Sequence, residues 1–163
     1  MPLANGASTL PGADDSSVDS LARQILLVVA GGGLFGIPLE GSREILEGRT
    51  CTPLPGSASC VRGLINLRGR LVTVLDLGDR IGLAGVNAGT DHNIVILEHE
   101  GKRVGLAVDE VVRIHRPHEG ETVTDAGFHA LRSHNPCLAG SGRVEGKLFT
   151  LLDPDSIFRP VFS

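Results

Sequence analysis

The side chains that could carry chemistry in this sequence are six histidines and three cysteines, and their spacing argues against a reactive or metal site. His115 and His118 lie three residues apart, but Pro117 interrupts any helix that would bring both imidazoles to one face. The cysteines form no C-x-x-C pair, and the sequence places no base near Cys60. We therefore predict no metal, no cofactor and no catalytic nucleophile, with reduced thiols at Cys51, Cys60 and Cys137.

A glycine-rich segment, Gly31 to Gly36, fits the G-x-G-x-x-G pattern of dinucleotide-binding loops. In those loops, glycines let a pyrophosphate approach the N-terminus of the helix that follows. Here Pro38 stands where that helix would have to continue, which argues against a nucleotide site. We interpret Gly31–Gly33 as a hairpin turn, because glycine adopts positive φ there without steric cost.

Residues 48–75 contain four arginines and no acidic residue, which makes a local basic segment in a chain of net charge −4. Guanidinium groups bind carboxylates in a planar, two-bonded geometry, so such a segment is typical of an interface with an acidic partner. The alternative is that these arginines only balance nearby acids at the surface. The sequence leaves both interpretations open for Arg49, Arg62, Arg68 and Arg70.

The elements that must position these residues are short apolar runs divided by glycine, rich in β-branched residues and of strand length. No long run keeps a helical period, so we predict a mostly β fold. Strands are expected near residues 25–30, 34–39, 61–67, 71–75, 93–97, 103–108, 111–115, 137–139 and 148–152. Short helices are expected near residues 57–60, 77–81, 126–133 and 154–158.

An internal repeat is clearest between residues 69–76 and 146–153, where five of eight positions are identical. These segments are 77 residues apart, whereas the segments before them match more weakly at a spacing of 69. Asp76 and Asp153 end the repeated strands, where an aspartate caps a following helix. We predict two similar β-barrels of about five strands, at residues 21–88 and 89–163, after an acidic tail at 1–20.

Composition argues against several classes of function. No apolar run approaches the ~20 residues that span a bilayer, and residues 1–20 lack the features of a secretory signal, so a cytoplasmic location is expected. The acidic charge balance and the absence of Trp and Tyr argue against nucleic-acid binding. Neither a P-loop nor a G-x-S-x-G motif occurs. A small ligand-binding enzyme that uses the histidines stays as a distant alternative.

Residues 61–77, VRGLINLRGRLVTVLDL, resemble the signature of the chemotaxis coupling protein (CheW) family, which runs G-V-I-N-L-R-G-x-x-V-P-V-x-D-L. Residues 105–111 and 151–153 resemble two later segments, so the likeness covers about residues 22–160. The resemblance implies two five-stranded SH3-like barrels, in agreement with the repeat. It also implies a non-catalytic adaptor, or scaffold, that joins methyl-accepting chemotaxis receptors to the regulatory domain of a CheA-type histidine kinase in signal transduction.

The same resemblance suggests which residues contact these partners. Arg68 matches the family arginine tied to receptor and kinase coupling, and Gly63 and Gly69 match the glycines that flank it. Glu44 matches an interface acid. The predicted partner-binding set, with Asn66 from the N-L-R-G motif and Arg62 from the basic segment, is Arg68, Glu44, Gly63, Asn66, Gly69 and Arg62.

The chain departs from the family pattern at Ser42 and Arg43, beside Glu44, and at Thr73, which replaces the usual proline. An adaptor of the same family in a non-flagellar pathway, such as twitching motility or development, is the alternative function. The free protein is expected to be a monomer. We expect it to be recruited from the cytoplasm to membrane-associated receptor arrays without entering the membrane itself.

Overall fold

The computed structural model describes residues 24–39, 43–83, 85, 92–117, 122–123 and 134–162. The expected tail at 1–20 and the expected helix at 126–133 lie outside these ranges. The described strands are β1 Ile25–Ala30, β2 Gly33–Pro38, β3 Arg43–Arg49, β4 Val61–Leu67, β5 Arg70–Asp76, β6 His92–His99, β7 Lys102–Val108, β8 Glu110–His115, β9 Thr122–Val123, β10 Leu138–Val144 and β11 Lys147–Leu152. The described helices are α2 Leu77–Arg80 and α4 Pro154–Phe162.

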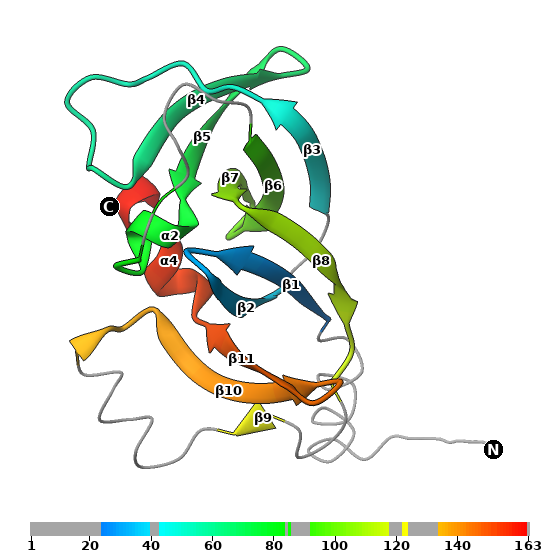
Figure 1. Cartoon of the computed structure of the whole chain (residues 1–163). Helices are drawn as coiled ribbons and strands as arrows, with labels where there is room; N and C mark the ends of the chain where they lie inside the picture. The colour runs from blue at the N-terminus through cyan, green and yellow to red at the C-terminus, as the bar shows by residue number, and fades with distance from the viewer. Residues whose placement is uncertain are drawn as a thin grey trace, which may run out of the picture.

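The strands form two curved sheets, one above the other in Figure 1, with α2 and α4 together at one side. The first sheet has the order β8-β1-β2-β11-β10-β9, and the second has the order β3-β6-β7-β5-β4. At the repeat spacings of 69 and 77 residues, five strands of the first sheet match the five strands of the second in the same order. The predicted mostly β fold, with two similar five-stranded units and short helices, is confirmed.

The two sheets are built by an exchange of hairpins between the two halves of the sequence. The β1–β2 hairpin joins β8, β10 and β11 of the second half, and the β6–β7 hairpin joins β3, β4 and β5 of the first half. Parallel pairing makes both junctions, with β2 beside β11 and β7 beside β5. The sheets therefore do not separate at residues 88 and 89, because repeat spacing identifies equivalent residues and not hydrogen-bonded neighbours.

The predicted elements differ from the observed ones in three places. The β3 strand was not expected, because its sequence, REILEGR, is largely charged and exposed. Residues 57–60 form turns rather than a helix, and α4 is longer than its predicted range. The strands that the sequence located best are those whose side chains are buried over most of their length, such as β1 and β7.

One hydrophobic core is shared by both sheets, and each sheet also has a smaller core of its own. The shared core takes Leu26 and Val28 from β1 and Leu106 from β7, together with Ile157 and Phe158 of α4. Because successive side chains of a strand face opposite sides, the alternate residues of these strands fill the separate cores. The shared core couples the two halves, so we expect them to unfold together.

The two helices dock against each other and couple the repeats. Pro160 lies inside α4 and has no N–H to donate to the carbonyl of Ser156, four residues earlier. Arg80 of α2 donates to this oxygen at 2.5 Å and to the Ile157 carbonyl at 3.1 Å. A residue of the first half thus satisfies a carbonyl that proline leaves without its helical partner in the second half. No helix in the described ranges is long and apolar enough to cross a membrane.

Candidate functional site

The predicted site residue Arg68 lies in the two-residue turn between β4 and β5. Arg68 has a φ of 52° and Gly69 a φ of 84°, as in the type I′ turns that favour glycine at the second position. The side-chain oxygen of Asn66 accepts a hydrogen bond from the Gly69 N–H at 2.9 Å. Asn66 and Gly69 therefore shape the turn, and Arg68 is the residue of the turn whose side chain is available for contacts.

The side chain of Arg68 forms a two-bonded ion pair with Glu44 of β3. Nη1 lies 3.0 Å from Oε2, and Nη2 lies 2.7 Å from Oε1. The Arg68 hydrogen bond lowers the pKa of Glu44, and Glu44 raises the pKa of Arg68, so both groups are charged at neutral pH. Arg68 is 60% exposed and Glu44 36% exposed, so a partner can reach the pair from solvent.

The matching turn of the other sheet carries an ion pair of opposite order. Glu145 takes the place of Arg68, also at positive φ (50°), and Arg113 of β8 takes the place of Glu44. Arg113 Nη2 lies 3.4 Å from Glu145 Oε1, and both side chains are exposed. The duplicated fold thus presents the same pair twice with the charges exchanged. The repeat spacing could have identified this second pair, which sequence reasoning missed.

The surface beside Arg68 and Glu44 is hollowed and mainly basic. A hollow of about 170 Å³ is lined by Arg43, Glu44 and Arg103, among other residues. A larger groove of about 510 Å³ is lined by Arg70, Leu71 and Lys102, and shares Arg103 and Glu98 with the first. A carboxylate-bearing partner is therefore complementary to this end of the second sheet.

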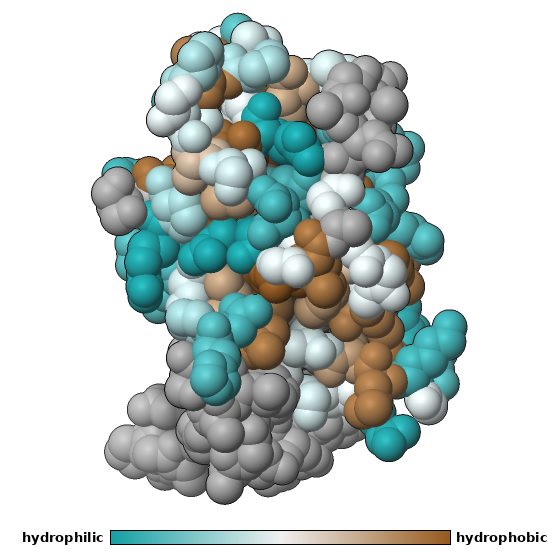
Figure 2. Space-filling view, turned by 60° about the vertical axis from the view of Figure 1, so that its left-hand side comes forward, coloured by the Kyte–Doolittle hydropathy of each residue, from teal (hydrophilic) through white to brown (hydrophobic). Residues whose placement is uncertain are grey.

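Apolar side chains are also available for contact. Figure 2 shows hydrophilic side chains across the middle of one face and a group of hydrophobic ones below them. Among all described residues, the most exposed large apolar side chains are Leu71 at 69% and Leu148 at 60%. They occupy equivalent positions, each the second residue of a strand that follows an ion-pair turn. Each sheet therefore offers an apolar contact close in sequence to a charged one.

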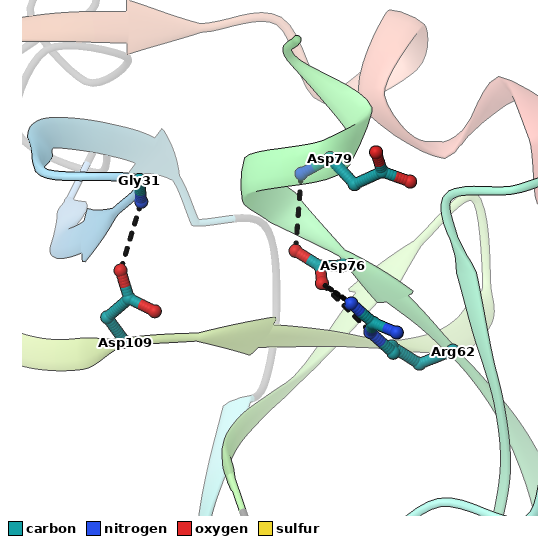
Figure 3. Close-up of polar contacts among 5 residues, drawn as sticks. All are labelled: Gly31, Arg62, Asp76, Asp79 and Asp109. Atoms are coloured by element: carbon teal, nitrogen blue, oxygen red, sulfur yellow. Dashed lines mark hydrogen bonds and ion pairs between the residues drawn. The ribbon is translucent and has the colours of Figure 1, made fainter. Parts of the chain in front are cut away.

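Arg62 is turned toward the protein rather than toward a partner. Its Nε and Nη2 lie 2.9 Å and 2.6 Å from Oδ2 of Asp76, whose side chain is 1% exposed, as Figure 3 shows. The other oxygen of Asp76 accepts the Asp79 N–H at 3.2 Å and so caps α2 as predicted. Asp153 caps α4 similarly through the Asp155 N–H and the Ser156 hydroxyl. Arg62 thus compensates a buried charge, the alternative that the sequence had left open.

Gly63 is required by a close backbone approach. Its φ is 144°, and a Cβ atom at this position would lie 2.0 Å from the carbonyl oxygen of Thr52. Thr52 is fixed there by two backbone hydrogen bonds with Leu64, each 2.8 Å long. The structural requirement at Gly63 is independent of any partner.

The glycine-rich segment forms a hairpin turn, as predicted. Gly31 and Gly32 have φ values of 58° and 84°, and β1 pairs with β2 on either side of them. Asp109 reinforces the turn by accepting the Gly31 N–H at 3.0 Å (Figure 3). The helix that a dinucleotide site would need is replaced by the strand β2.

The cysteines are shielded thiols, and their reactivity can be predicted. Burial raises the pKa of all three, and Cys60 and Cys137 are buried whereas Cys51 is only half-buried. Because the thiolate is the reactive form, we expect slow alkylation of the native protein by iodoacetamide at pH 7.5, with Cys51 modified first. Mass spectrometry of tryptic peptides measures this order. Rapid modification of Cys60 or Cys137 in the folded protein would contradict it.

Comparisons with known proteins agree with this architecture. The sequence model of the CheW-like domain matches residues 24–161, nearly the whole described chain. The chain belongs to the CheW family.

Its CheW-family relatives include two chemotaxis proteins and one protein of another name. It is similar to "Chemotaxis protein CheW" of Rhizobium meliloti strain 1021, with 28% identity over 141 residues, 83% of this chain and 87% of that one. It is also similar to "Chemotaxis protein CheW" of Helicobacter pylori strain 26695, at 25% over 142 residues, 85% of this chain and 83% of that one. "Protein PilI" of Pseudomonas aeruginosa PAO1 is 35% identical over 81 residues, 50% of this chain and 46% of its own length.

A solved structure shares the fold. The scaffolding protein TtCheW from Thermoanaerobacter tengcongensis aligns with a TM-score of 0.66 at 24% identity, over 84% of this chain and 88% of that one. The CheW fold therefore extends through both sheets of the present chain, and the ion-pair turns belong to this fold.

Proposed function

We propose that this chain is a non-catalytic adaptor that couples methyl-accepting chemotaxis receptors to a CheA-type histidine kinase. Membership of the CheW family over residues 24–161 supports the adaptor role. The observation that carries the residue assignment is the solvent-accessible pair of Arg68 and Glu44 on an otherwise rigid hairpin. The protein acts in the cytoplasm, and as a monomer when free, until partners recruit it to receptor arrays.

The shared core gives this adaptor its mechanism. Both sheets pack on one set of buried side chains, so surfaces on different sheets keep a fixed relative orientation. A receptor bound to one surface and a kinase bound to another are then held in a defined geometry. A shift in the receptor changes the relative populations of active and inactive kinase, without any chemistry in the adaptor.

Arg68 is the residue through which we expect the charged contact to form. Its guanidinium already binds one carboxylate in the two-bonded geometry, and a partner carboxylate can compete with Glu44 or join it. A receptor helix hairpin beside Arg68 would pack on nearby apolar side chains such as Leu71 and Ile45, which are exposed. The regulatory domain of the kinase would bind a separate apolar surface.

A second candidate is an adaptor of the same family in a non-flagellar pathway, such as twitching motility or development. The observation that favours it is the local match to PilI, whose 35% identity exceeds that of the full-length relatives named above. Both candidates share the coupling function and differ only in the receptor and the output. Purification of the chain from its own cells with its bound kinase, identified by mass spectrometry, separates the two.

The test of the residue assignment is the charge reversal Arg68→Glu. Glu145 occupies the matching turn at nearly the same φ, so the fold accepts glutamate there and the thermal midpoint should change by less than about 2 °C. We expect at least a tenfold loss of affinity for a receptor or kinase fragment, measured by isothermal titration calorimetry, because an attraction becomes a repulsion.

The matched control is Glu145→Arg, which reverses the charge of the equivalent turn on the other sheet. If Arg68→Glu melts early, Arg68 stabilises the fold instead of binding a partner. If Arg68→Glu and Glu145→Arg weaken the same partner equally, the effect comes from overall charge, and the assignment of Arg68 is wrong.

A further inference from the structure

Three side chains that can ligate a cation meet where the β6–β7 turn approaches α4. His99 ends β6, Glu100 follows it in the turn, and Asp155 lies in the first turn of α4. One potential ligand atom from each residue lies within 4.8 Å of those of the other two. Nε2 of His99 is only 2.8 Å from Oδ1 of Asp155, so two of the three already face each other closely.

The imidazole at the centre of this cluster is held in place by packing. His99 is 4% exposed, and its ring lies against the ring of Phe158, with centroids 5.2 Å apart and planes inclined at 47°. The two carboxylates are exposed, so a cation can enter from solvent and both can adjust to it. A fixed buried nitrogen with two accessible oxygens is a suitable arrangement for a cation clip at the protein surface.

The repeat provides an internal comparison. At the spacings of 69 and 77 residues, His99, Glu100 and Asp155 correspond to Ala30, Gly31 and Gly78. The first half therefore builds the equivalent hairpin and helix start without any of these polar groups. The cluster is an addition to the second half that the common fold does not require, which is why a ligand-binding role is worth testing.

We propose that His99, Glu100 and Asp155 form a binding site for a zinc-class divalent cation that ties the β6–β7 turn to α4. One imidazole nitrogen and two carboxylate oxygens are a donor set that Zn²⁺ accepts, with water at the fourth position. Mg²⁺ and Ca²⁺ prefer all-oxygen sites and should bind less well. Gly101, Lys102 and Val161 line the basic groove on either side of this junction, so a bound cation would fix the width of the groove.

The test is the thermal midpoint of the full chain, stripped with a chelator and then titrated with zinc chloride. Binding to the folded state alone should raise the midpoint by about 5–10 °C at a hundredfold excess over Kd. Magnesium chloride at the same concentration should have little effect. His99→Gln and Asp155→Asn should each abolish the zinc-dependent rise, whatever their midpoint without metal, because the measured quantity is the increment.

Glu100→Gln and Glu145→Gln form a matched pair for the same experiment. Both residues are exposed and occupy x-Gly turns at positive φ, but only Glu100 lies beside a buried histidine. We expect the zinc-dependent rise to be reduced in Glu100→Gln and kept in Glu145→Gln. No rise in the parent chain, or an undiminished rise in His99→Gln, would overturn the proposal. The adaptor function does not depend on this site, so either can fail alone.

Discussion

Gly63→Ala is expected to lower the free energy of unfolding by at least about 3 kcal/mol. A methyl group at this position would lie 2.0 Å from the Thr52 carbonyl oxygen, inside any permitted contact distance, and φ would be held at 144°. Thr52 cannot move aside without breaking its two hydrogen bonds to Leu64. Urea denaturation followed by far-ultraviolet circular dichroism measures the change.

Gly69→Ala is the matched control for this prediction. Gly69 also has a positive φ, but nothing lies within 4 Å of where its Cβ atom would be. Only the backbone strain of a left-handed residue applies, at about 1–2 kcal/mol. If Gly63→Ala were as stable as the parent chain and only partner binding fell, Gly63 would be a contact residue and the close-approach argument would be wrong.

The second large effect is expected at Arg62. Arg62→Met removes the guanidinium that binds the Asp76 carboxylate, which is 1% exposed, while Arg62 itself is 26% exposed. Breaking a buried ion pair on one side costs about 3–5 kcal/mol, and partial exposure of the arginine places the expected loss near 3 kcal/mol. The same urea titration applies, and Arg70→Met on the same hairpin, where the arginine is exposed, should change stability by about 0.5 kcal/mol or less.

A double variant separates charge from packing at this pair. Arg62→Met with Asp76→Asn removes both charges, so it should be more stable than Arg62→Met alone if the unpaired carboxylate causes the loss. The asparagine oxygen can still accept the Asp79 N–H and cap α2. A double variant no more stable than Arg62→Met would show that the arginine acts mainly by packing.

The sequence predicted the elements best where burial dictates residue type. β4 was predicted with its observed ends, because glycine turns and apolar residues define it clearly. β3 was missed because most of its side chains face solvent, although its repeat equivalent β8 had been predicted. The hairpin exchange could not be inferred, since identical repeats pair equally well within one half or between halves. Only the three-dimensional packing of the shared core distinguishes these arrangements.

The candidate site shows the same division. Arg68 and Glu44 were both predicted, but their direct pairing requires β3 to lie beside the β4–β5 turn, which no sequence spacing reveals. The roles of Gly63, Asn66 and Gly69 are explained by backbone geometry, and that of Arg62 by the buried Asp76. Of the predicted partner-binding set, Arg68 and Glu44 are therefore the pair that the fold leaves accessible, and their contact with a partner stays a prediction.

The measurement that tests the central claim most directly is co-sedimentation of the kinase with receptor-bearing vesicles. The account predicts that the kinase enters the pellet when the chain is present and stays largely in the supernatant when it is absent. Arg68→Glu, with an unchanged thermal midpoint, should reduce the sedimented kinase at least tenfold, and Glu145→Arg should reduce it less. Equal kinase in the pellet with and without the chain would contradict the adaptor function.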